Sequence, residues 1–593
     1  MTNLIALPNE ILHHVFKHVD PIDLAHLSRS CKSLNSNIAS DGQLYRAVYC
    51  QILDKPTQEK VGEIDYEKNL KDLVRFRYIL NNSASASEKA IHLPFIADFT
   101  TTLLRTASGG PTSSNITLLK SHISSSRPST TNLEAFLSQS VTFNRASLSP
   151  HAATHSHPPL PSLPHRQASA KLHVLYGKPI LLPRRTHFNT PYPYAVSMVY
   201  DLRNYTEATM WGPYMGDGQA SVDWEKLEAV MLVLGHNVES FRASIGEQML
   251  PRGLVWKEGW KGAQPYSYRS VDIAGEDSDE EEVVEEVEDG DGDGEEGEGS
   301  EVVEDPYNIT GTWMRVSACH PHTNPSLEII KHIKHKNTNI RQQVVCFLDF
   351  HDLFAYNFTS PTMPAGTPRP ALQTTEAIRL ITMELRVTHS EPPGPEDGQE
   401  HPVVYFEGVS RSLHSAWDVN ANSNIRGNVR MTKEGEVRWQ SISVYNGEER
   451  WRSEGIQIGG IQSARGVLGH WFDKDHDVHG PAGPTAFYKV SDQIKKRGPA
   501  SEEDIESNYW EVELEQELED DDEEEVQAFI GQLAQSIGLP LNHGHGHGNT
   551  LHFHTHTHLH GHGHGHGHGH EHVEEGSGAN AGSGFGEGGQ ETS

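Results

Sequence analysis

Residues 1–50 carry the clearest hydrophobic pattern of the chain. Apolar residues recur there at three- and four-residue spacing, the period of one helix face: Ile11, Leu12, Val15, Phe16 and Val19. Pro8 suits the first turn of that helix, Asp20-Pro21 ends it, and a second helix with Leu24 and Leu27 follows. A third short helix is predicted around Leu44. So small a unit cannot bury all of this apolar surface internally, so part of it should meet a partner.

The order of residues in this segment resembles the F-box. The family pattern begins Leu-Pro-x-Glu-Ile-Leu and contains Asp-Leu-x-x-Leu and a Cys-Lys pair, and the chain has matching residues at 7–12, 23–27 and 31–32. Tyr45 stands where the family often has Trp, which keeps an aromatic side chain there. The resemblance implies three helices that dock on the Skp-type adaptor of a cullin-RING (SCF) ubiquitin ligase. It places seven residues at the adaptor: Leu7, Pro8, Ile11, Leu12, Phe16, Leu24 and Leu27. The alternative is an amphipathic hairpin that packs on the rest of the chain.

Residues 51–167 are predicted to be a helical linker with mobile loops. Amphipathic spacing predicts helices over 66–80, 91–104 and 133–136. The segments 82–90, 106–131 and 149–166 are rich in Ser, Thr, Asn, Gly, His or Pro, and they are expected to be loops.

Residues 168–495 are predicted to form a β-barrel domain, so that the chain is an α+β multidomain protein. Strands are expected at 171–177 and 195–202, and a helix at 223–235. A folded segment at 307–315 precedes short stretches that alternate apolar and polar residues: 377–387, 403–408, 425–431, 436–445, 466–471 and 486–490. Many short alternating strands separated by glycine indicate an antiparallel sheet, closed as a barrel or folded as a sandwich.

Several motifs in this region are similar to fungal F-box proteins: residues 200–203, 211–214, 222–225, 311–313, 427–431, 437–439, 451–455 and 459–460. The C-terminal domain of those proteins is akin to the lipocalin-like barrel of certain animal F-box-only proteins. The resemblance implies that the barrel captures a target protein, with candidate contacts at Trp313, Arg426, Arg430, Arg438 and Trp439. The preferred alternative for the two tryptophans is that they fill the barrel core, because aromatic side chains dominate core burial.

Two predicted insertions interrupt the barrel domain. The acidic run 275–305 has almost no aromatic residues and is expected to be disordered. Residues 317–343 separate two segments that are nearly contiguous in the resembling proteins, and their His, Lys and Asn content matches neither neighbour. We hypothesise that they are a translated, retained intron, with a genuine loop insertion as the alternative; transcripts lacking these codons would decide for the former.

Charge and motifs exclude several function classes. The formal net charge of −33 disfavours nonspecific binding to nucleic acid or to an anionic membrane. The four cysteines have no CxxC spacing, and no nucleotide, hydrolase or metalloprotease motif occurs. We therefore expect an intracellular, non-catalytic protein of the cytoplasm or nucleus that needs no cofactor.

Residues 496–593 are predicted to be an acidic and His/Gly-rich disordered tail. Its alternating histidines, among them His543, His545, His547, His562 and His564, are suited to adventitious capture of Zn²⁺, Ni²⁺ or Cu²⁺. A second His and Asp cluster at 470–479 is expected to be a solvated loop rather than a metal site. The resemblance to the F-box implies that the chain is a substrate receptor of an SCF-type ligase. The alternatives are a metal-binding protein that acts through the tail and a lipocalin-like small-molecule binder or enzyme.

Overall fold

The structure is a computed structural model, and it describes residues 7–39, 41–55, 64–110, 112–124, 130–147, 160–180, 190–245, 258–270, 303–318, 350–359, 363, 367–374, 378–412, 422–477 and 479–494. Nearly all of the predicted insertions 275–305 and 317–343, and the predicted tail 496–593, lie outside the described residues.

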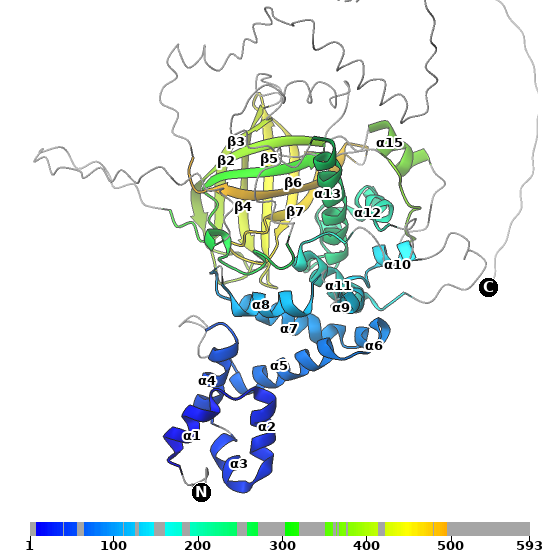
Figure 1. Cartoon of the computed structure of the whole chain (residues 1–593). Coiled ribbons are helices and arrows are strands. Elements are labelled where there is room, and N and C mark those ends of the chain that lie inside the picture. Colours follow the sequence, from blue (N-terminus) through cyan, green and yellow to red (C-terminus); the bar gives the residue numbers. More distant parts are fainter. Residues whose placement is uncertain are drawn as a thin grey trace, which may run out of the picture. The chain divides into compact units, whose positions relative to one another are not determined.

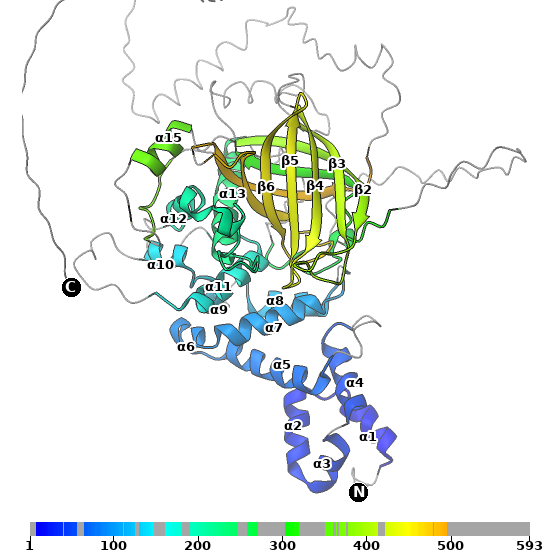
Figure 2. The ribbon, with the colours of Figure 1, turned by 180° about the vertical axis from the view of Figure 1, so that it is seen from behind.

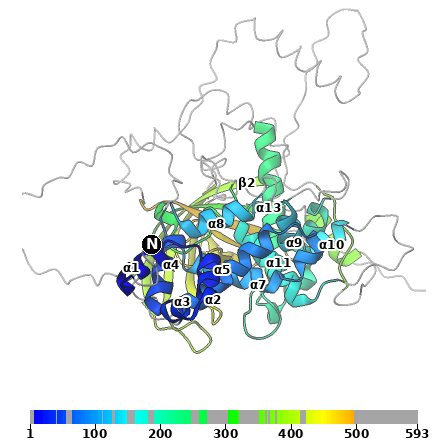
Figure 3. The ribbon, with the colours of Figure 1, turned by 60° about the horizontal axis from the view of Figure 1, so that its bottom comes forward.

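The N-terminal segment is helical, as predicted, with one helix more than expected. It contains α1 (Asn9–Phe16), α2 (Pro21–Ser30), α3 (Lys32–Ile38) and α4 (Gly42–Ile52), and α3 has no counterpart in the sequence prediction. Two aspartates cap helices: Asp20 accepts from the backbone N–H of Ile22 at 3.0 Å, and Asp41 from that of Leu44 at 3.0 Å. Figure 3 shows α1 to α5 gathered together, and α5 (Tyr66–Asn81) contacts both α2 and α4.

The following region holds more helix than predicted. The predicted helices at 66–80, 91–104 and 133–136 are confirmed as α5, α7 (Leu93–Arg105) and α9 (Thr130–Leu137). Two of the predicted loops instead contain the short helices α6 (Ala86–Ala90) and α8 (Ser114–His122), and α10 (Val141–Ser147) follows. In α6 the Ser85 backbone N–H donates to Glu88 Oε2 at 2.8 Å, completing a capping box that stabilises so short a helix.

The two strands predicted at 171–177 and 195–202 are wrong. The first segment belongs to α11 (Leu163–Tyr176) and most of the second to α12 (Tyr192–Val199). Helix α11 ends at Gly177, which has a φ of 70° and donates its N–H to the His173 carbonyl at 2.9 Å. Residues 172–176 are all buried, so no alternation distinguishes a helix from a strand there. The predicted helix at 223–235 is confirmed as part of α13 (Trp224–Ile245), which continues past Gly235.

Eight antiparallel strands close into a barrel, which confirms the predicted fold class. The strands follow chain order, and β1 (Gly311–Ala318) pairs with both β2 and β8. The others are β2 (Ile378–Glu391), β3 (Val403–Ser412), β4 (Asn422–Met431), β5 (Val437–Tyr445), β6 (Glu448–Gln457), β7 (Val467–Asp473) and β8 (Ala482–Ser491). Strand β1 runs two residues into the predicted insertion 317–343, since Ser317 pairs with Arg379 and Ala318 with Ile378. The strands lie between residues 311 and 491, whereas the described part of 163–245 is largely helical.

Two hydrophobic cores result from this arrangement. One fills the barrel, around Trp313, Trp439 and Phe487. The other joins the helices and extends to the outer face of the barrel, where α13 contacts β7 and β8 (Figure 1). Residues of β7 and β8 are therefore buried on both faces, while β2 to β4 keep exposed residues on their outer face, which is visible in Figure 2. The outer face of β5 is partly covered. Strand β6, which has no counterpart among the predicted strands, is also buried on both faces over its last five residues.

Candidate functional site

The N-terminal helices expose apolar side chains on one face of α1 and the start of α2. Ile11 and Val15, one helical turn apart, are 49% and 43% exposed, and Ile22 in the first turn of α2 is 45% exposed. Pro8, which caps α1, is also exposed. We call Pro8, Ile11, Val15 and Ile22 the α1–α2 patch.

The first turn of α2, which carries Ile22, is held in place by Asp20. One oxygen of its carboxylate caps α2, and the other accepts a hydrogen bond from Arg77 of α5 at 3.1 Å. The same side chain therefore sets the start of the helix and fixes it against α5. Exposed ion pairs contribute little energy, so the capping role matters more.

In the barrel, the two tryptophans proposed as substrate contacts lie in the core. Trp313 and Trp439 are each 2% exposed, and their rings meet edge to face with centroids 4.9 Å apart. Both indole N–H groups are satisfied internally, Trp313 by the Ile309 carbonyl at 2.7 Å and Trp439 by Gln457 Oε1 at 3.1 Å. Both tryptophans therefore lie where the alternative prediction places them, in the barrel core.

Arg438 points out of the barrel but is partly buried by the segment that contains Tyr214. It donates to both oxygens of Glu454 at 3.0 and 3.1 Å, and Glu454 also accepts from Tyr214 at 3.3 Å and from Gln440 at 2.6 Å. Burial opposes the charge, but Glu454 and Tyr214 together raise the pKa of Arg438 above its ordinary value. These contacts tie the barrel to the helical region, so Arg438 is occupied structurally.

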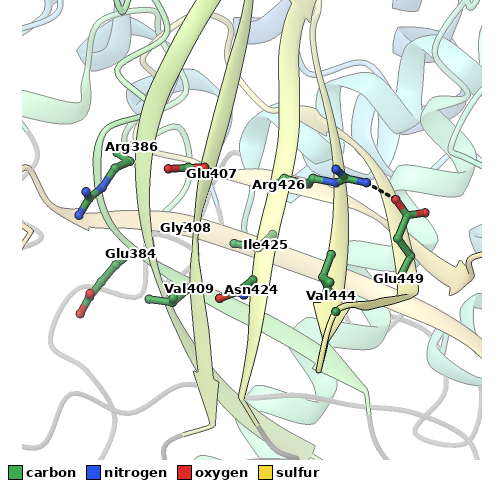
Figure 4. Close-up of a pocket in the computed structure, with 11 residues that line it drawn as sticks. Glu384, Arg386, Glu407, Gly408, Val409, Asn424, Ile425, Arg426, Val444 and Glu449 are labelled. Carbon is green, nitrogen blue, oxygen red and sulfur yellow. Dashed lines mark hydrogen bonds and ion pairs between the residues drawn. The ribbon is translucent and has the colours of Figure 1, made fainter.

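Arg426 lines a groove on the outer face of β2 to β5. The groove has a volume of about 530 Å³, and Figure 4 shows charged side chains on both sides of Val409, Asn424 and Val444. Arg386 and Arg426 supply positive charge, and Glu384, Glu407 and Glu449 supply negative charge. Arg426 pairs with Glu449, and this hydrogen bond lowers the pKa of the Glu449 carboxyl. Arg430 lies outside the groove lining and pairs with Asp397 at 3.6 Å.

Comparison with known proteins identifies the N-terminal region alone. Residues 4–51 match the family model described as F-box-like. They form an F-box-like domain. No curated protein and no solved structure matches the chain, so the likeness of the barrel to lipocalin-like domains of other F-box proteins stays a prediction.

The structure divides the seven residues predicted to contact an adaptor into three groups. Pro8 and Ile11 are exposed, and Leu7 and Leu27 are partly buried. Leu12, Phe16 and Leu24 are only 1%, 1% and 2% exposed and belong to the helical core. In the F-box-like domain, α1 packs mainly on α4, and α2 on α3 and α5, so helices rather than the barrel cover these three residues.

The described residues contain no group of three or more His, Cys, Asp or Glu side chains arranged to hold a metal ion. His470 belongs to β7 and is buried against Tyr205 with ring centroids 3.8 Å apart, so it is not in the solvated loop predicted for 470–479. The histidines named in the tail, His543 to His564, lie outside the described residues. Within the described ranges, no helix has the length and apolarity to cross a membrane.

Several residues of the candidate site are not among those predicted from the sequence. Val15 and Ile22 extend the α1–α2 patch, and Glu384, Arg386 and Glu407 extend the groove. The signal for the groove was present as alternation: Met383 and Leu385 face the barrel core, so Glu384 and Arg386 must face outward. Alternation alone does not show that outward residues of three strands converge.

Proposed function

We propose that this chain is the substrate-recognition subunit of an SCF-type (cullin-RING) E3 ubiquitin ligase. The observation that carries the proposal is the F-box-like domain at residues 4–51, whose α1 and α2 expose a patch of apolar side chains. Its role is non-catalytic: ubiquitin transfer belongs to the RING and E2 partners, and the chain supplies proximity by raising the effective concentration of the target. The proposal places the protein in the cytoplasm or the nucleus.

The α1–α2 patch is the proposed contact with the Skp-type adaptor, through which cullin and RING subunits join. Ile11 and Val15 are adjacent on α1, and exposed aliphatic side chains at such spacing favour docking into an apolar groove of a partner. Leu12, Phe16 and Leu24 then act from beneath, by fixing the helices that carry the patch. Within the prediction from the sequence, Pro8 and Ile11 are the residues best placed for direct contact.

The groove on β2 to β5 is the proposed target-binding surface, with Arg426 as its contact from the sequence prediction. Opposite charges alternate along it, from Glu384 and Arg386 on β2 to Glu407 on β3 and Arg426 on β4. Such a surface favours a polypeptide segment that carries charges of both signs. The barrel's likeness to the lipocalin-like domain of F-box-only proteins is part of this proposal.

Affinity capture of the protein from cells tests both the adaptor contact and the target-binding groove. Ile11→Asp combined with Ile22→Asp should remove the adaptor and cullin from the captured proteins while groove-bound targets stay. Both residues are about half exposed, so the fold should survive the change. The matched control is Ile91→Asp, which alters an aliphatic side chain that is 73% exposed outside the F-box-like domain.

A charge reversal examines the groove separately. Arg426→Glu places a second carboxylate beside Glu449, so two like charges replace an ion pair. Targets should therefore be lost from the captured proteins, while the adaptor is retained. Adaptor recovery that is unchanged by the double Ile variant would refute the docking surface. Targets that are unchanged by Arg426→Glu would refute the groove.

A further inference from the structure

The interior of the barrel is apolar around Trp313 and Trp439, and it becomes more polar toward the end of the barrel at which Arg315 lies. Cross-strand neighbours point to the same face of a sheet, so the register identifies the interior residues. Arg315 is opposite Phe487 and Ile381, Ser410 is opposite Met383, and Ser443 is opposite Ile425; Phe487, Met383 and Ile425 belong to the barrel core. Beside the apolar Ile381, Met383 and Ile425, this half of the lumen therefore carries several hydroxyl groups and one guanidinium: Arg315, Ser410, Ser423, Ser441, Ser443, Ser453 and Thr485.

Arg315 is buried without an acid. It is 6% exposed, and its Nε–H donates one hydrogen bond to Thr485 Oγ1 at 3.0 Å. Among the described residues, no carboxylate forms an ion pair with it. Burial lowers the pKa of Arg315 to about 10, against an opposing effect of Tyr445, so the guanidinium stays charged at neutral pH.

Two other cations on the barrel strands, the partly buried Arg438 and the buried Lys489, have carboxylate partners. Arg438 has Glu454, and Lys489 pairs with Asp492 at 2.7 Å and donates to the Asn308 carbonyl at 3.0 Å. A guanidinium left inside a barrel with most of its donors unused is costly, because desolvation is not offset by a charged partner. An anion that entered the lumen would supply that partner in a fork geometry suited to a carboxylate.

The other residues of the lumen indicate which chemical groups the rest of the ligand would carry. Below Arg315, the rings of Trp313, Trp439 and Phe487 pack edge to face at 4.9 to 5.9 Å between centroids, which closes the lumen on that side. Away from that floor, the Ser441 and Ser453 hydroxyls meet at 2.6 Å, and the Trp451 and Trp471 rings lie 5.3 Å apart. Hydroxyl groups and aromatic faces together suit a small hydroxylated ring.

We propose that the barrel lumen binds a small aromatic carboxylate bearing hydroxyl groups, with the carboxylate on Arg315 and the ring directed toward the serine hydroxyls. This site is distinct from the outer groove and independent of adaptor docking, since none of its polar residues lines the groove or the α1–α2 patch.

The test is titration of the full-length protein with 4-hydroxybenzoate, followed by calorimetry and by the thermal unfolding midpoint. The neutral isostere 4-hydroxybenzamide separates charge recognition from ring binding. Binding of 4-hydroxybenzoate with a raised midpoint is expected, and 4-hydroxybenzamide should bind at least roughly tenfold more weakly, the size of a hydrogen bond to a charged group.

Variants assign the effect to Arg315. Arg315→Met should abolish 4-hydroxybenzoate binding while the unliganded protein unfolds at the same or a higher temperature, because an apolar side chain replaces an uncompensated buried charge. Lys433→Met removes one positive charge from the barrel surface, where the side chain is 42% exposed, and should bind like the wild type. No binding of 4-hydroxybenzoate, equal binding of the amide, or unchanged affinity in Arg315→Met would each overturn the assignment.

Discussion

Replacing Trp439 should destabilise the barrel rather than weaken target binding selectively. The indole of Trp439 is 2% exposed, lies 4.9 Å from the Trp313 ring and 5.3 Å from the Phe487 ring, and donates to Gln457 Oε1. Trp439→Phe keeps an aromatic ring but deletes the donor and leaves a gap. Losing the hydrogen bond costs about 1 kcal/mol, and an unsatisfied Gln457 oxygen with incomplete packing adds about 1–3 kcal/mol. The expected loss is about 2–4 kcal/mol.

Urea unfolding of the full-length protein, followed by near-ultraviolet circular dichroism, measures this loss. Adding Gln457→Leu removes the orphaned acceptor and should recover about 1 kcal/mol, a coupling that a double-mutant cycle detects. Trp211→Phe is the matched control, because Trp211 stacks on His476 with centroids 3.7 Å apart and lies outside both hydrophobic cores. Trp439→Phe that unfolds like the wild type yet loses its targets would refute the core assignment.

Two further predictions concern proton and metal binding. Burial raises the pKa of Glu225 to about 7, despite opposing contacts from the Val141 N–H and Arg166, so the folded state holds this proton more tightly than the unfolded state. Its contribution to stability is complete below the ordinary carboxyl pKa of 4.5 and is lost as the pH rises through about 7. Glu225→Gln should therefore gain about 1–3 kcal/mol over the wild type at about pH 8 but little at about pH 5, measured by urea unfolding. A wild type whose stability does not fall between those two values contradicts this assignment. Deleting residues 541–572 should abolish retention on immobilised Ni²⁺, and the full chain should elute as the pH falls below about 6.5; retention by the deletion variant would place the metal ligands elsewhere.

Periodicity predicted the elements that keep one exposed face. Helix α1 shows a clear apolar stripe, and the strands β2 to β4 alternate because their outer face keeps exposed residues. The strand predictions for the residues of α11 and α12 are wrong because the rest of the protein packs around both helices. Buried residues therefore occur on several sides of each helix, and no one-sided helical pattern remains. Ser85 with Glu88 was a usable signal for α6, since Ser-x-x-Glu is a helix start.

The candidate site was predictable only in part, for reasons of geometry. The motif at 7–12 indicated the N-terminal helices, but which face of α1 stays open depends on α4, which the pattern does not place. Arg426 and Arg438 both alternate with core residues and look equivalent in sequence. Arg438 is partly buried because Tyr214, distant in the sequence, and Glu454 of the adjacent strand β6 cover it, whereas Arg426 is 63% exposed.

The most direct test of the ligase-receptor account is the affinity between the purified full-length chain and a purified Skp-type adaptor, measured by isothermal titration calorimetry. The account predicts saturable one-to-one binding that Ile11→Asp weakens by about 2–4 kcal/mol, roughly 30- to 1000-fold, because a carboxylate would be buried in an apolar contact. Ile91→Asp should bind with the affinity of the wild type. Absence of binding by the wild type, or equal affinities for the wild type and Ile11→Asp, would contradict the account.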